Sequence, residues 1–367
     1  MSMEALAPSE AAFFRAQCRA DLQKTDQPEP TTLASMKALV YTNPNEMQLQ
    51  ERPYPAAAAD EVVLRIDAVG ICGSDMHAYH GHDPRRQPGL VLGHEFAGTV
   101  ADGPRAGRRV TGNPLIACGT CDYCAQGRNN LCSNRTMVGM TRPGAFAEYM
   151  SIPAQCLIDL PEGMDPLCAA LTEPAATALH ALNLSMRALH RPLPECRTLV
   201  LGGGAIGLLC ALLLRSYGVH DVVLAETNPL RRASAERHAG CNTYDPAVTV
   251  AAAGASAFDY VIDAVGGKAT RNAAFEAIRP GGVIMHIGLQ DWASEIDMRR
   301  LTLSEITLIG TYTYTTADLR ATVAALYNNV FGDLGWVKER RLDEGAAAFA
   351  DLHHGRTAAA KVVLRPH

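Results

Sequence analysis

Short apolar runs recur through the middle of the chain, from about residue 197 to residue 310. They are rich in Val, Ile and Leu, most of them end in glycine or an acid, and alanine-rich stretches separate them. Runs that are apolar at nearly every position are typical of strands buried on both faces of a parallel sheet. The expected strands span residues 197–201, 221–226, 258–266, 281–288 and 306–310. Their alternation with helices predicts a doubly wound parallel sheet, which binds ligands at the carboxyl ends of its strands.

The first 35 residues have a different pattern. Alanines and charged residues come first, and a segment containing Pro28 and Pro30 follows. This composition predicts a flexible N-terminal extension, residues 1–35. It lacks a basic start followed by an apolar core, so it is not expected to be a secretory signal. The first strand is expected at residues 36–41, and Met36 is a candidate for the natural start of the protein.

Length, composition and charge narrow the class of protein. The chain has 367 residues, of which 48% are hydrophobic and 19% charged. This length predicts two domains, or three, and the apolar content excludes disorder over the whole chain. The formal net charge of −5 gives no electrostatic reason to bind nucleic acid or an anionic membrane. The longest apolar stretch, residues 205–214, is far shorter than the roughly 20 residues that span a bilayer.

Four of the eleven cysteines lie within 15 residues: Cys118, Cys121, Cys124 and Cys132. Zinc binds four thiolates at tetrahedral corners, and gaps of two residues let neighbouring thiolates converge on one ion. We therefore expect a closed, structural zinc site. An iron–sulfur cluster uses the same ligands, and a zinc-finger-like nucleic-acid binder would also explain them, although the negative charge disfavours the latter. Free cysteines without a signal peptide predict a reducing compartment, and hence a cytoplasmic protein.

A second set of metal-binding residue types is spread along the chain. Cys72 follows a predicted strand at residues 62–68, His94 lies in Gly-His-Glu, and Glu173 lies in Thr-Glu-Pro. Each is weak evidence alone, because a single histidine in a turn is more often a structural hydrogen bonder. Together, one thiolate, one imidazole and one carboxylate make the three-ligand set of a catalytic zinc, which leaves a position for water or substrate.

The glycines after the first strand of the predicted parallel sheet match a dinucleotide-binding fingerprint. Gly202, Gly204 and Gly207 form Gly-x-Gly-x-x-Gly between that strand and a helical stretch at residues 208–217. Glycine at these positions permits a tight turn and lets a pyrophosphate approach the N-terminus of the helix. The coenzyme-binding residues expected in and around this turn are Gly202, Gly204, Ala205, Ile206, Gly207 and Val265.

Glu226 predicts the identity of the coenzyme. It ends the next strand about 20 residues after the last glycine, where an acid accepts hydrogen bonds from ribose hydroxyls. A carboxylate there also repels a 2′-phosphate, so NAD is favoured over NADP. Arg231 and Arg232 follow on the chain and oppose this preference, because nearby arginines accommodate the phosphate of NADP.

The chain is similar to the zinc-containing medium-chain dehydrogenase/reductase family, in its sorbitol/threonine dehydrogenase-like branch, from residue 36 to the C-terminus. The motifs that carry the resemblance are Gly70-x-Cys72-Gly73-Ser74-Asp75-x-His77, Gly93-His94-Glu95-x-x-Gly98 and the four-cysteine cluster. The resemblance implies two zinc ions per chain, with Cys72, His94 and Glu173 on the catalytic one. It implies Glu95 as an alternate or water-bridged ligand, and Arg231 beside the adenosine of the coenzyme.

The resemblance also implies an architecture. The expected fold is α/β, with a GroES-like β-barrel catalytic domain at residues 36–179 and 312–367. A Rossmann domain with a doubly wound parallel sheet, residues 180–311, is inserted into it. Members of the family associate through their nucleotide domains, so a homodimer or homotetramer is expected.

The implied reaction is hydride transfer between the carbinol carbon of a secondary alcohol or polyol and NAD. The substrate classes left open are sugar alcohols, cyclitols and amino alcohols. In relatives, the positions of Ser74 and His77 relay the released proton, and histidine suits this task because its unperturbed pKa is about 6.5. Tyr314 matches a tyrosine that contacts polyol hydroxyls. Thr313 stands where sorbitol dehydrogenases have an arginine, so sorbitol itself is not expected.

Two other functions fit parts of the sequence. An NADPH-linked ketone or aldehyde reductase would use the same scaffold, and titration with both nicotinamide coenzymes would separate the two. A catalytically idle, nucleotide-binding redox sensor would not need the complete set of metal-binding and relay residues. A loop after the first motif is expected to be solvated rather than to contact substrate. Its basic residues are His80, His82, Arg85 and Arg86.

Overall fold

The computed structural model describes residues 35–249 and 255–367. Of the predicted N-terminal extension, only Ser35 lies inside the described residues, and it begins the first strand. Strand β1 (Ser35–Asn43) pairs with β2 (Glu46–Pro53) in an antiparallel hairpin. The predicted strand at residues 36–41 is therefore present and extends further at both ends.

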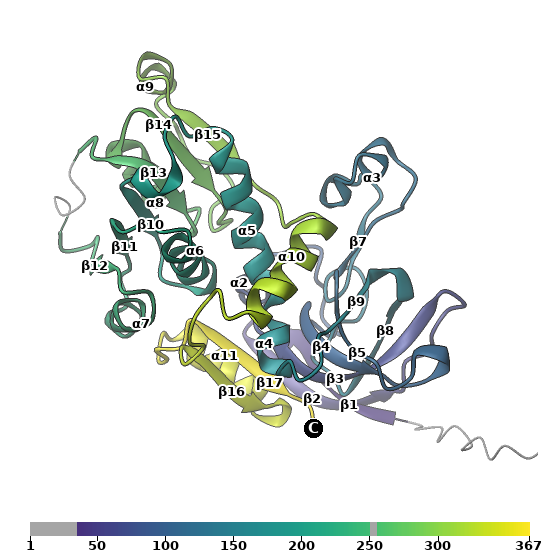
Figure 1. Ribbon diagram of the computed structural model, residues 1–367. Helices are drawn as coiled ribbons and strands as arrows, with labels where there is room; N and C mark the ends of the chain where they lie inside the picture. The colour runs from purple at the N-terminus through teal and green to yellow at the C-terminus, as the bar shows by residue number, and fades with distance from the viewer. Residues whose placement is uncertain (1–34, 250–254) are drawn as a thin grey trace, which may run out of the picture. The chain divides into compact units, whose positions relative to one another are not determined.

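A seven-stranded sheet brings the C-terminal part of the chain beside residues 61–159. Its order is β16-β17-β3-β4-β5-β9, with β8 paired to β3, and only the pair β16–β17 is parallel. The strands are β3 (Glu61–Gly70), β4 (Glu95–Val100), β5 (Arg109–Gly112), β8 (Tyr149–Pro153), β9 (Leu157–Asp159), β16 (Val337–Arg341) and β17 (Lys361–Arg365). Figure 1 shows β17, in yellow, next to β3, and β16 pairs with the other edge of β17. The first and last parts of the chain therefore share one sheet.

Two helices pack together against the core of this sheet. They are α2 (Gly73–Tyr79), which directly follows β3, and α11 (Gly345–His353). Tyr79 and Phe349 are buried with ring centres 5.4 Å apart, and they belong to the same core as Leu64 and Phe96. This packing fixes the end of α2 against α11.

Six parallel strands form the second large sheet, in the order β12-β11-β10-β13-β14-β15. They are β10 (Thr198–Leu201), β11 (Val222–Ala225), β12 (Asn242–Tyr244), β13 (Phe258–Asp263), β14 (Ile278–His286) and β15 (Thr307–Gly310). All five predicted strands are present, and β12 was not predicted. Chain order reverses between β10 and β13, which is the place where doubly wound sheets bind ligands.

Helices cover both faces of the parallel sheet. Val200 and Met285 pack in one core with residues of α5 and α6, whereas Leu199 and Ile284 pack in another with residues of α8. These helices are α5 (Thr172–Met186), α6 (Ala205–Ser216), α7 (Pro229–Ala239) and α8 (Lys268–Ala277), whereas α10 (Thr316–Tyr327) packs on α5. The predicted doubly wound arrangement is confirmed.

The remaining elements are short: α3 (Asp122–Ala125), α4 (Pro166–Ala170), α9 (Met298–Leu303), β6 (Leu115–Ile116) and β7 (Thr136–Met137). Within residues 35–249 and 255–367, no helix has both the length and the apolar character needed to cross a membrane.

Candidate active site

Three metal-binding side chains meet where β3, α2 and β4 come together. Cys72 lies between β3 and α2, His94 immediately precedes β4, and Glu95 is the first residue of β4. Pairing of Gly70 with Glu95 between β3 and β4 brings these distant segments together. One ligand atom from each of the three side chains lies within 4.8 Å of the others. A thiol, an imidazole and a carboxylate are donors that zinc accepts, so the group fits a zinc ion.

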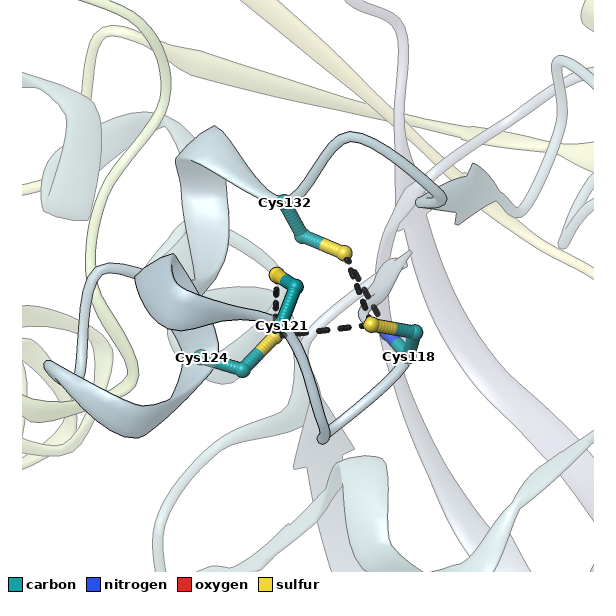
Figure 2. Close-up of side chains that lie close together, drawn as sticks. All are labelled: Cys118, Cys121, Cys124 and Cys132. Carbon is teal, nitrogen blue, oxygen red and sulfur yellow. Dashed lines mark hydrogen bonds between the residues drawn. The ribbon is translucent and has the colours of Figure 1, made fainter.

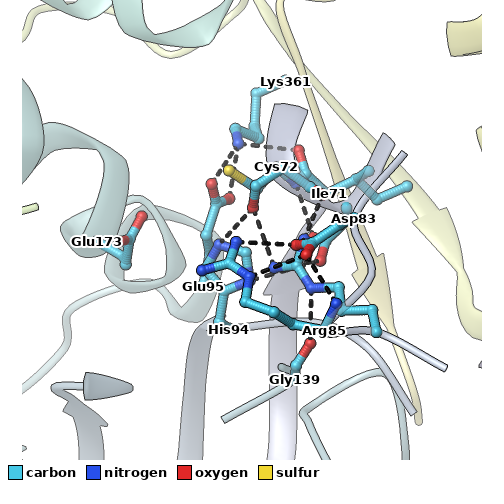
Figure 3. A network of polar contacts seen from close by, with 12 residues as sticks. Ile71, Cys72, Asp83, Arg85, His94, Glu95, Gly139, Glu173 and Lys361 are labelled. Atoms are coloured by element: carbon cyan, nitrogen blue, oxygen red, sulfur yellow. Dashed lines mark hydrogen bonds and ion pairs between the residues drawn. The ribbon is translucent and has the colours of Figure 1, made fainter. Parts of the chain in front are cut away.

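Glu173, the predicted third ligand, lies beside this group but is not part of it. It is buried in the first turn of α5, and its Oε1 accepts a hydrogen bond from the Tyr314 hydroxyl at 3.0 Å. Figure 3 shows its side chain apart from Cys72, with Glu95 closer to the cysteine. Burial raises the pKa of Glu173 to about 7. The charge of His94 lowers this pKa, and the charge of Glu95 raises it. Its role as a ligand stays a prediction.

Lys361 holds the Glu95 carboxylate. Its Nζ donates to Oε1 and Oε2 of Glu95 at 2.7 and 2.6 Å, and to the Ile71 carbonyl at 2.9 Å. Both charged groups are buried. Burial lowers the pKa of Lys361, but the negative charges of Glu95 and Cys72 outweigh it and leave the pKa raised. Sequence reasoning missed Lys361, and its signal was a lysine at the start of the apolar run Lys-Val-Val-Leu.

Asp75 connects two of the predicted zinc ligands. Its Oδ2 accepts a hydrogen bond from the Cys72 backbone N–H at 3.1 Å, and its Oδ1 lies 3.5 Å from His94 Nδ1. A carboxylate behind a metal-binding imidazole fixes the orientation of the ring and its tautomer. The other ring nitrogen of His94, Nε2, lies 3.4 Å from the Ser74 hydroxyl. The orientation of His94 thus depends on the first turn of α2.

Arg86 is buried, so its predicted position in a solvated loop is wrong. Its guanidinium donates to the Ser74 carbonyl, to the Ser74 hydroxyl at 3.3 Å and to the Gly139 carbonyl at 3.2 Å. Asp83 and Asp75 lie 3.5 and 3.9 Å from it. These acids compensate the buried charge, which is why a loop arginine is accommodated here. The loop neighbours Arg85 and His82 are exposed, as expected.

The two predicted relay residues lie on α2. Ser74 is in its first turn, and His77 is half-buried in its last turn. Burial, followed by the charges of His82 and Arg86, lowers the pKa of His77. His77 is therefore neutral near pH 7 and able to accept a proton.

The four cysteines of the predicted structural site converge, as Figure 2 shows. Sulfur–sulfur distances are 3.5 Å for Cys121–Cys124, 3.5 Å for Cys118–Cys132 and 4.0 Å for Cys118–Cys124. Four sulfurs at 2.3 Å from a tetrahedral zinc are about 3.8 Å apart, so the cluster fits one zinc ion. The Thr120 backbone N–H and hydroxyl lower the pKa of Cys118 to about 6, which favours the thiolate that zinc requires.

The cysteine loop also contacts the segment that carries Tyr314. The Asn130 side-chain amide donates to the Tyr312 carbonyl at 2.8 Å, and the Arg135 guanidinium lies 4.8 Å from the centre of the Tyr312 ring. Tyr314 itself is buried and points its hydroxyl at Glu173. The loop therefore supports the residues next to Glu173.

The glycine motif forms a tight turn between β10 and α6. Gly202 has φ +100°, which favours glycine, and a side chain at Gly207 would place its Cβ 1.8 Å from the Gly202 carbonyl oxygen. Gly204 caps α6, whose first residues are Ala205 and Ile206. A Cβ on Gly202 would also meet the Val265 side chain at 2.5 Å. The structure thus brings the predicted turn and Val265 together at the N-terminus of α6.

Glu226 lies against this turn. Its Oε2 accepts a hydrogen bond from the Gly203 backbone N–H at 2.8 Å, and its Oε1 accepts one from the Asn228 N–H at 2.8 Å. A carboxylate has about four lone-pair sites, so it can still accept hydrogen bonds from a ribose. Arg232 is occupied by the carbonyls of Glu226 and Thr227 at 2.7 and 2.8 Å. Arg231 is half-buried on the first turn of α7, and its Nε has no partner in the described part of the chain.

Two family models match the chain. The Alcohol dehydrogenase GroES-like domain matches residues 58–162, and the Zinc-binding dehydrogenase model matches residues 205–328. These matches, with the parallel sheet, confirm the predicted fold class.

Proteins with assigned names resemble the chain over most of its length. It is 32% identical to L-galactonate-5-dehydrogenase of Escherichia coli (strain K12) over 299 residues, which are 78% of this chain and 86% of that protein. It is 31% identical to L-threonine 3-dehydrogenase of Chelativorans sp. (strain BNC1) over 347 residues, 90% of this chain and 98% of that protein. Among solved structures, a Sinorhizobium meliloti 1021 protein assigned as a zinc-binding dehydrogenase and bound to NADP is 30% identical, with a TM-score of 0.79. That match covers 90% of this chain and 99% of the other.

Proposed function

Because the chain belongs to the zinc-containing medium-chain dehydrogenase/reductase family, in its sorbitol/threonine dehydrogenase-like branch, we propose that it oxidises a polar secondary alcohol with NAD. It is a nicotinamide-dependent zinc alcohol or polyol dehydrogenase. The observation that carries the finer proposal is the Cys72–His94–Glu95 group, in which His94 and Glu95 are buried and Cys72 is partly exposed, in a chain that also holds a glycine turn backed by Glu226.

We place the catalytic zinc at Cys72 and His94, with Glu173 as the third ligand. Glu95 is nearer to the other two, but both of its oxygens are bound by Lys361, which neutralises its charge. Glu173 instead has the neutral Tyr314 hydroxyl as its hydrogen-bond donor, and a bound metal ion would favour the charged form of Glu173 that burial disfavours. Zinc at this place would supply a Lewis acid that polarises the hydroxyl oxygen of the substrate.

The proton released in the oxidation is assigned to Ser74 and His77. They are three residues apart on α2, which puts them on one face of the helix. Ser74 lies beside His94, and His77 has a lowered pKa and accepts a proton near pH 7. The side chain of His82, which acts on the pKa of His77, is exposed to solvent. Ser74, His77 and His82 therefore provide a path for a proton from the neighbourhood of His94 to solvent.

The segment beside Tyr314 favours a substrate with several polar groups. The hydroxyls of Thr311 and Thr313 are buried without a partner among the described residues. Thr313 also has φ +46°, a strained conformation for a β-branched residue and one that is enriched at functional sites. Substrate hydroxyls or a carboxylate would satisfy these groups. The names of the two relatives, L-galactonate and L-threonine dehydrogenases, point to hydroxy acids, which fit this chemistry.

Glu226 supports NAD rather than NADP as the coenzyme. Its carboxylate is held at the glycine turn, where a 2′-phosphate would meet a negative charge. The alternative is an NADPH-linked ketone or aldehyde reductase. It is favoured by the similar structure that contains NADP and by the Arg231 Nε, which has no hydrogen-bond partner among residues 35–249 and 255–367.

The isosteric change Glu226→Gln tests the coenzyme preference. It removes the charge and keeps the size of the side chain, although the amide oxygen can accept from only one of the Gly203 and Asn228 N–H groups. We expect the ratio of kcat/KM for NADP to that for NAD to rise at least about tenfold, or ~1.4 kcal/mol. Glu236→Gln, on the exposed side of α7, is the matched control and should leave the ratio unchanged. An unchanged ratio in Glu226→Gln would remove the argument for NAD.

A substrate panel tests the reaction itself. Polyols, aldonic and hydroxy acids, amino alcohols and simple secondary alcohols are offered with NAD, and NADH absorbance is followed with and without a chelator. We expect turnover with a polar class, weak or no turnover with simple alcohols, and loss of turnover with the chelator. Activity confined to NADPH and carbonyl compounds would favour the reductase instead.

Further properties are proposed with this function. Two zinc ions per chain follow from the two ligand groups, and a cytoplasmic location follows from the ten free cysteines among the described residues. The catalytic domain is assigned to residues 36–179 and 312–367, since β16 and β17 complete the sheet of β3, and the coenzyme domain to residues 180–311. We also propose that the chain forms a homodimer or homotetramer.

A further inference from the structure

Two loops cross at the carboxyl ends of β13 and β14. The β13 loop, residues 264–267, connects β13 to α8, and the β14 loop, residues 287–297, connects β14 to α9. Their backbones are so close that a Cβ on Gly266 would lie 1.9 Å from the Gly288 carbonyl oxygen, and Gly266 has φ +72°. Glycine is needed at this crossing, and the conformation of each loop depends on the other.

Arg271 joins the two loops through its side chain. It lies in the first turn of α8 and is half-buried. Its guanidinium donates to the Gly266 carbonyl of the β13 loop at 2.8 Å. It also donates to two groups of the β14 loop, the Asp291 carbonyl and, at 2.9 Å, the Ser294 hydroxyl. Because a guanidinium carries five N–H donors in a rigid fork, one side chain spans acceptors on both loops.

Backbone hydrogen bonds close the same junction. The Gln290 N–H donates to the Val265 carbonyl at 3.1 Å. The Asp291 N–H donates to the Gly266 carbonyl at 3.0 Å. From below, the buried Asp263 carboxylate accepts the N–H groups of Val265 and Gly266 at 3.1 and 2.8 Å. The turn at Val265 is therefore held through its N–H groups by β13 and through its carbonyls by the β14 loop.

His286, the last residue of β14, fixes the guanidinium from another side. The Arg271 Nε–H donates to His286 Nε2 at 2.9 Å, so this imidazole is neutral and carries its proton on Nδ1. Burial and the charge of Arg271 lower the pKa of His286, although the charge of Asp263 opposes them. Arg271 thus has partners on α8's own side of the sheet, on β14 and on both loops, and its orientation is set before any ligand binds.

The topology of the sheet relates this junction to the coenzyme. A dinucleotide lies across the point where chain order reverses, with one mononucleotide on each half of the sheet. With the adenosine half proposed at the glycine turn and Glu226, the nicotinamide half falls to β13–β15. Val265 lies against the glycine turn, since a Cβ on Gly202 would meet its side chain at 2.5 Å. The β13 and β14 loops are therefore the surface offered to the nicotinamide half.

We propose that Arg271 is a positioning residue for the nicotinamide half of the coenzyme. By joining the two loops, it fixes the backbone at Val265 and Gly288 before the coenzyme arrives, so that binding costs less conformational entropy. It acts through the loops and not on the reacting atoms. The inference rests on the proposed function, because it takes the ligand of the parallel sheet to be a nicotinamide dinucleotide.

Binding of whole and truncated coenzymes tests this role. Calorimetry measures the dissociation constants of NADH and of ADP-ribose, which lacks the nicotinamide, and of NADPH and 2′-phospho-ADP-ribose. No alcohol is present, so the result does not depend on the substrate. The variants are Arg271→Met and Arg271→Lys, the second of which keeps a positive charge near Asp263 but not the fork. Lys268→Met, at an exposed position of the same helix, is the matched control.

We expect both Arg271 variants to bind NADH at least about tenfold more weakly than the natural chain, with an ADP-ribose affinity that changes by less than about twofold. NADPH and its fragment should differ in the same way, and Lys268→Met should keep all affinities. Hydrogen exchange gives a second readout. The amides of Gln290 and Asp291 should exchange faster in the Arg271 variants, and those of α6 should not change.

An unchanged ratio of the whole-coenzyme and fragment affinities in both variants would overturn the proposal. So would an equal loss of NADH and ADP-ribose affinity, which a purely structural role predicts. Either result leaves the proposed function intact, because the natural chain still binds the coenzyme. A natural chain that binds neither NADH nor NADPH would contradict the proposed function and this inference together.

Discussion

Lys361 shows how a single residue from the end of the chain completes the active-site region. Its ammonium group is buried and donates to Glu95, which lies 266 positions earlier in the sequence. The free energy of this pair depends on both partners, because a buried charge left alone is far more costly than the pair itself.

The change Lys361→Met removes one partner and leaves the Glu95 carboxylate buried. We expect the free energy of unfolding to fall by about 3–5 kcal/mol, as for other broken buried ion pairs. Urea denaturation at pH 7 measures it. Lys338→Met, exposed on the adjacent strand β16, is the matched control and should change stability by no more than about 0.5 kcal/mol. Equal effects of the two changes would contradict a structural role for the pair.

Individual site residues were predictable where the signal is local. Short motifs contain Cys72, His94 and the four cysteines. In the structure, the side chains of Cys72 and His94 lie together in one group, and the four cysteines form another. Lys361 and Arg86 were not found, because their partners are distant in sequence and a lone basic residue in an apolar strand or a polar loop has several explanations. Their burial becomes visible only when β17 pairs with β3 and the loop folds onto Ser74.

At the scale of elements, α10 is tied to α5 by one carboxylate. Asp318, in the first turn of α10, accepts hydrogen bonds from the Thr315 hydroxyl at 2.6 Å, His180 Nδ1 at 2.8 Å and the Asn183 amide at 2.9 Å. Tyr314 immediately precedes this cap and reaches Glu173 on α5. The position of Tyr314 therefore depends on the contact between the two helices.

The same carboxylate predicts a pH-dependent stability. Burial alone would raise the pKa of Asp318, but the hydrogen bonds from His180 and Thr315 outweigh it and hold the pKa well below the usual range. A depressed folded-state pKa stabilises the protein above the unfolded pKa of about 4, and this contribution is lost as the pH falls further.

We expect Asp318→Asn to lower the free energy of unfolding by about 1.5–3 kcal/mol at pH 7. The difference in this free energy between the variant and the natural chain should narrow below about pH 4. Urea denaturation of both proteins from pH 7 to pH 3 measures this difference. Asp343→Asn, in an exposed ion pair, should show a small effect with little pH dependence. A difference between Asp318→Asn and the natural chain that stays constant with pH would exclude the charge as its cause.

Elements with strong apolar patterns were predicted, and weaker ones were not. The strands that became β10 and β13 are buried at every position, so their pattern is clear. β12 was missed because its three residues, Asn-Thr-Tyr, are polar or half-exposed and give no periodic signal. β14 begins at Ile278 rather than residue 281, because Ile278 pairs with Phe258 before the proline and glycines that suggested a turn.

At the scale of the whole molecule, the edge of the parallel sheet supports the proposed homo-oligomer. β15 is an edge strand, and an edge presents unpaired backbone groups to a further strand. Leu308 on this strand is 38% exposed, Leu303 is 70% exposed and Trp292 is 90% exposed. Leu308 and Trp292 also line one cavity of about 370 Å³. These exposed apolar groups lie at the edge where a second copy of the coenzyme domain would pair.

The change Leu308→Lys tests this edge as an interface. We expect the natural chain to be a dimer or tetramer by light scattering. Because a charge buried between two copies is costly, the variant should shift towards monomer. Leu230→Lys, also exposed but on α7, should keep the natural state. A monomeric natural chain at micromolar concentration would refute the proposal.

Domain organisation could not be taken from local patterns. The return of residues 337–365 to the sheet of β3 depends on pairing across most of the chain, and it was expected only from the family resemblance. The inserted coenzyme domain, by contrast, has its own repeating pattern. The proposed boundaries at residues 179/180 and 311/312 stay predictions.

Zinc content measured together with coenzyme binding is the most direct test of the proposed catalytic centre. We predict two zinc ions per chain in the natural protein. Cys72→Ser should retain one, bind NADH with unchanged affinity by fluorescence titration and lose turnover. Cys156→Ser, a half-buried cysteine outside both metal groups, should keep two zinc ions and full turnover. A Cys72→Ser protein with undiminished zinc and undiminished turnover would contradict the account.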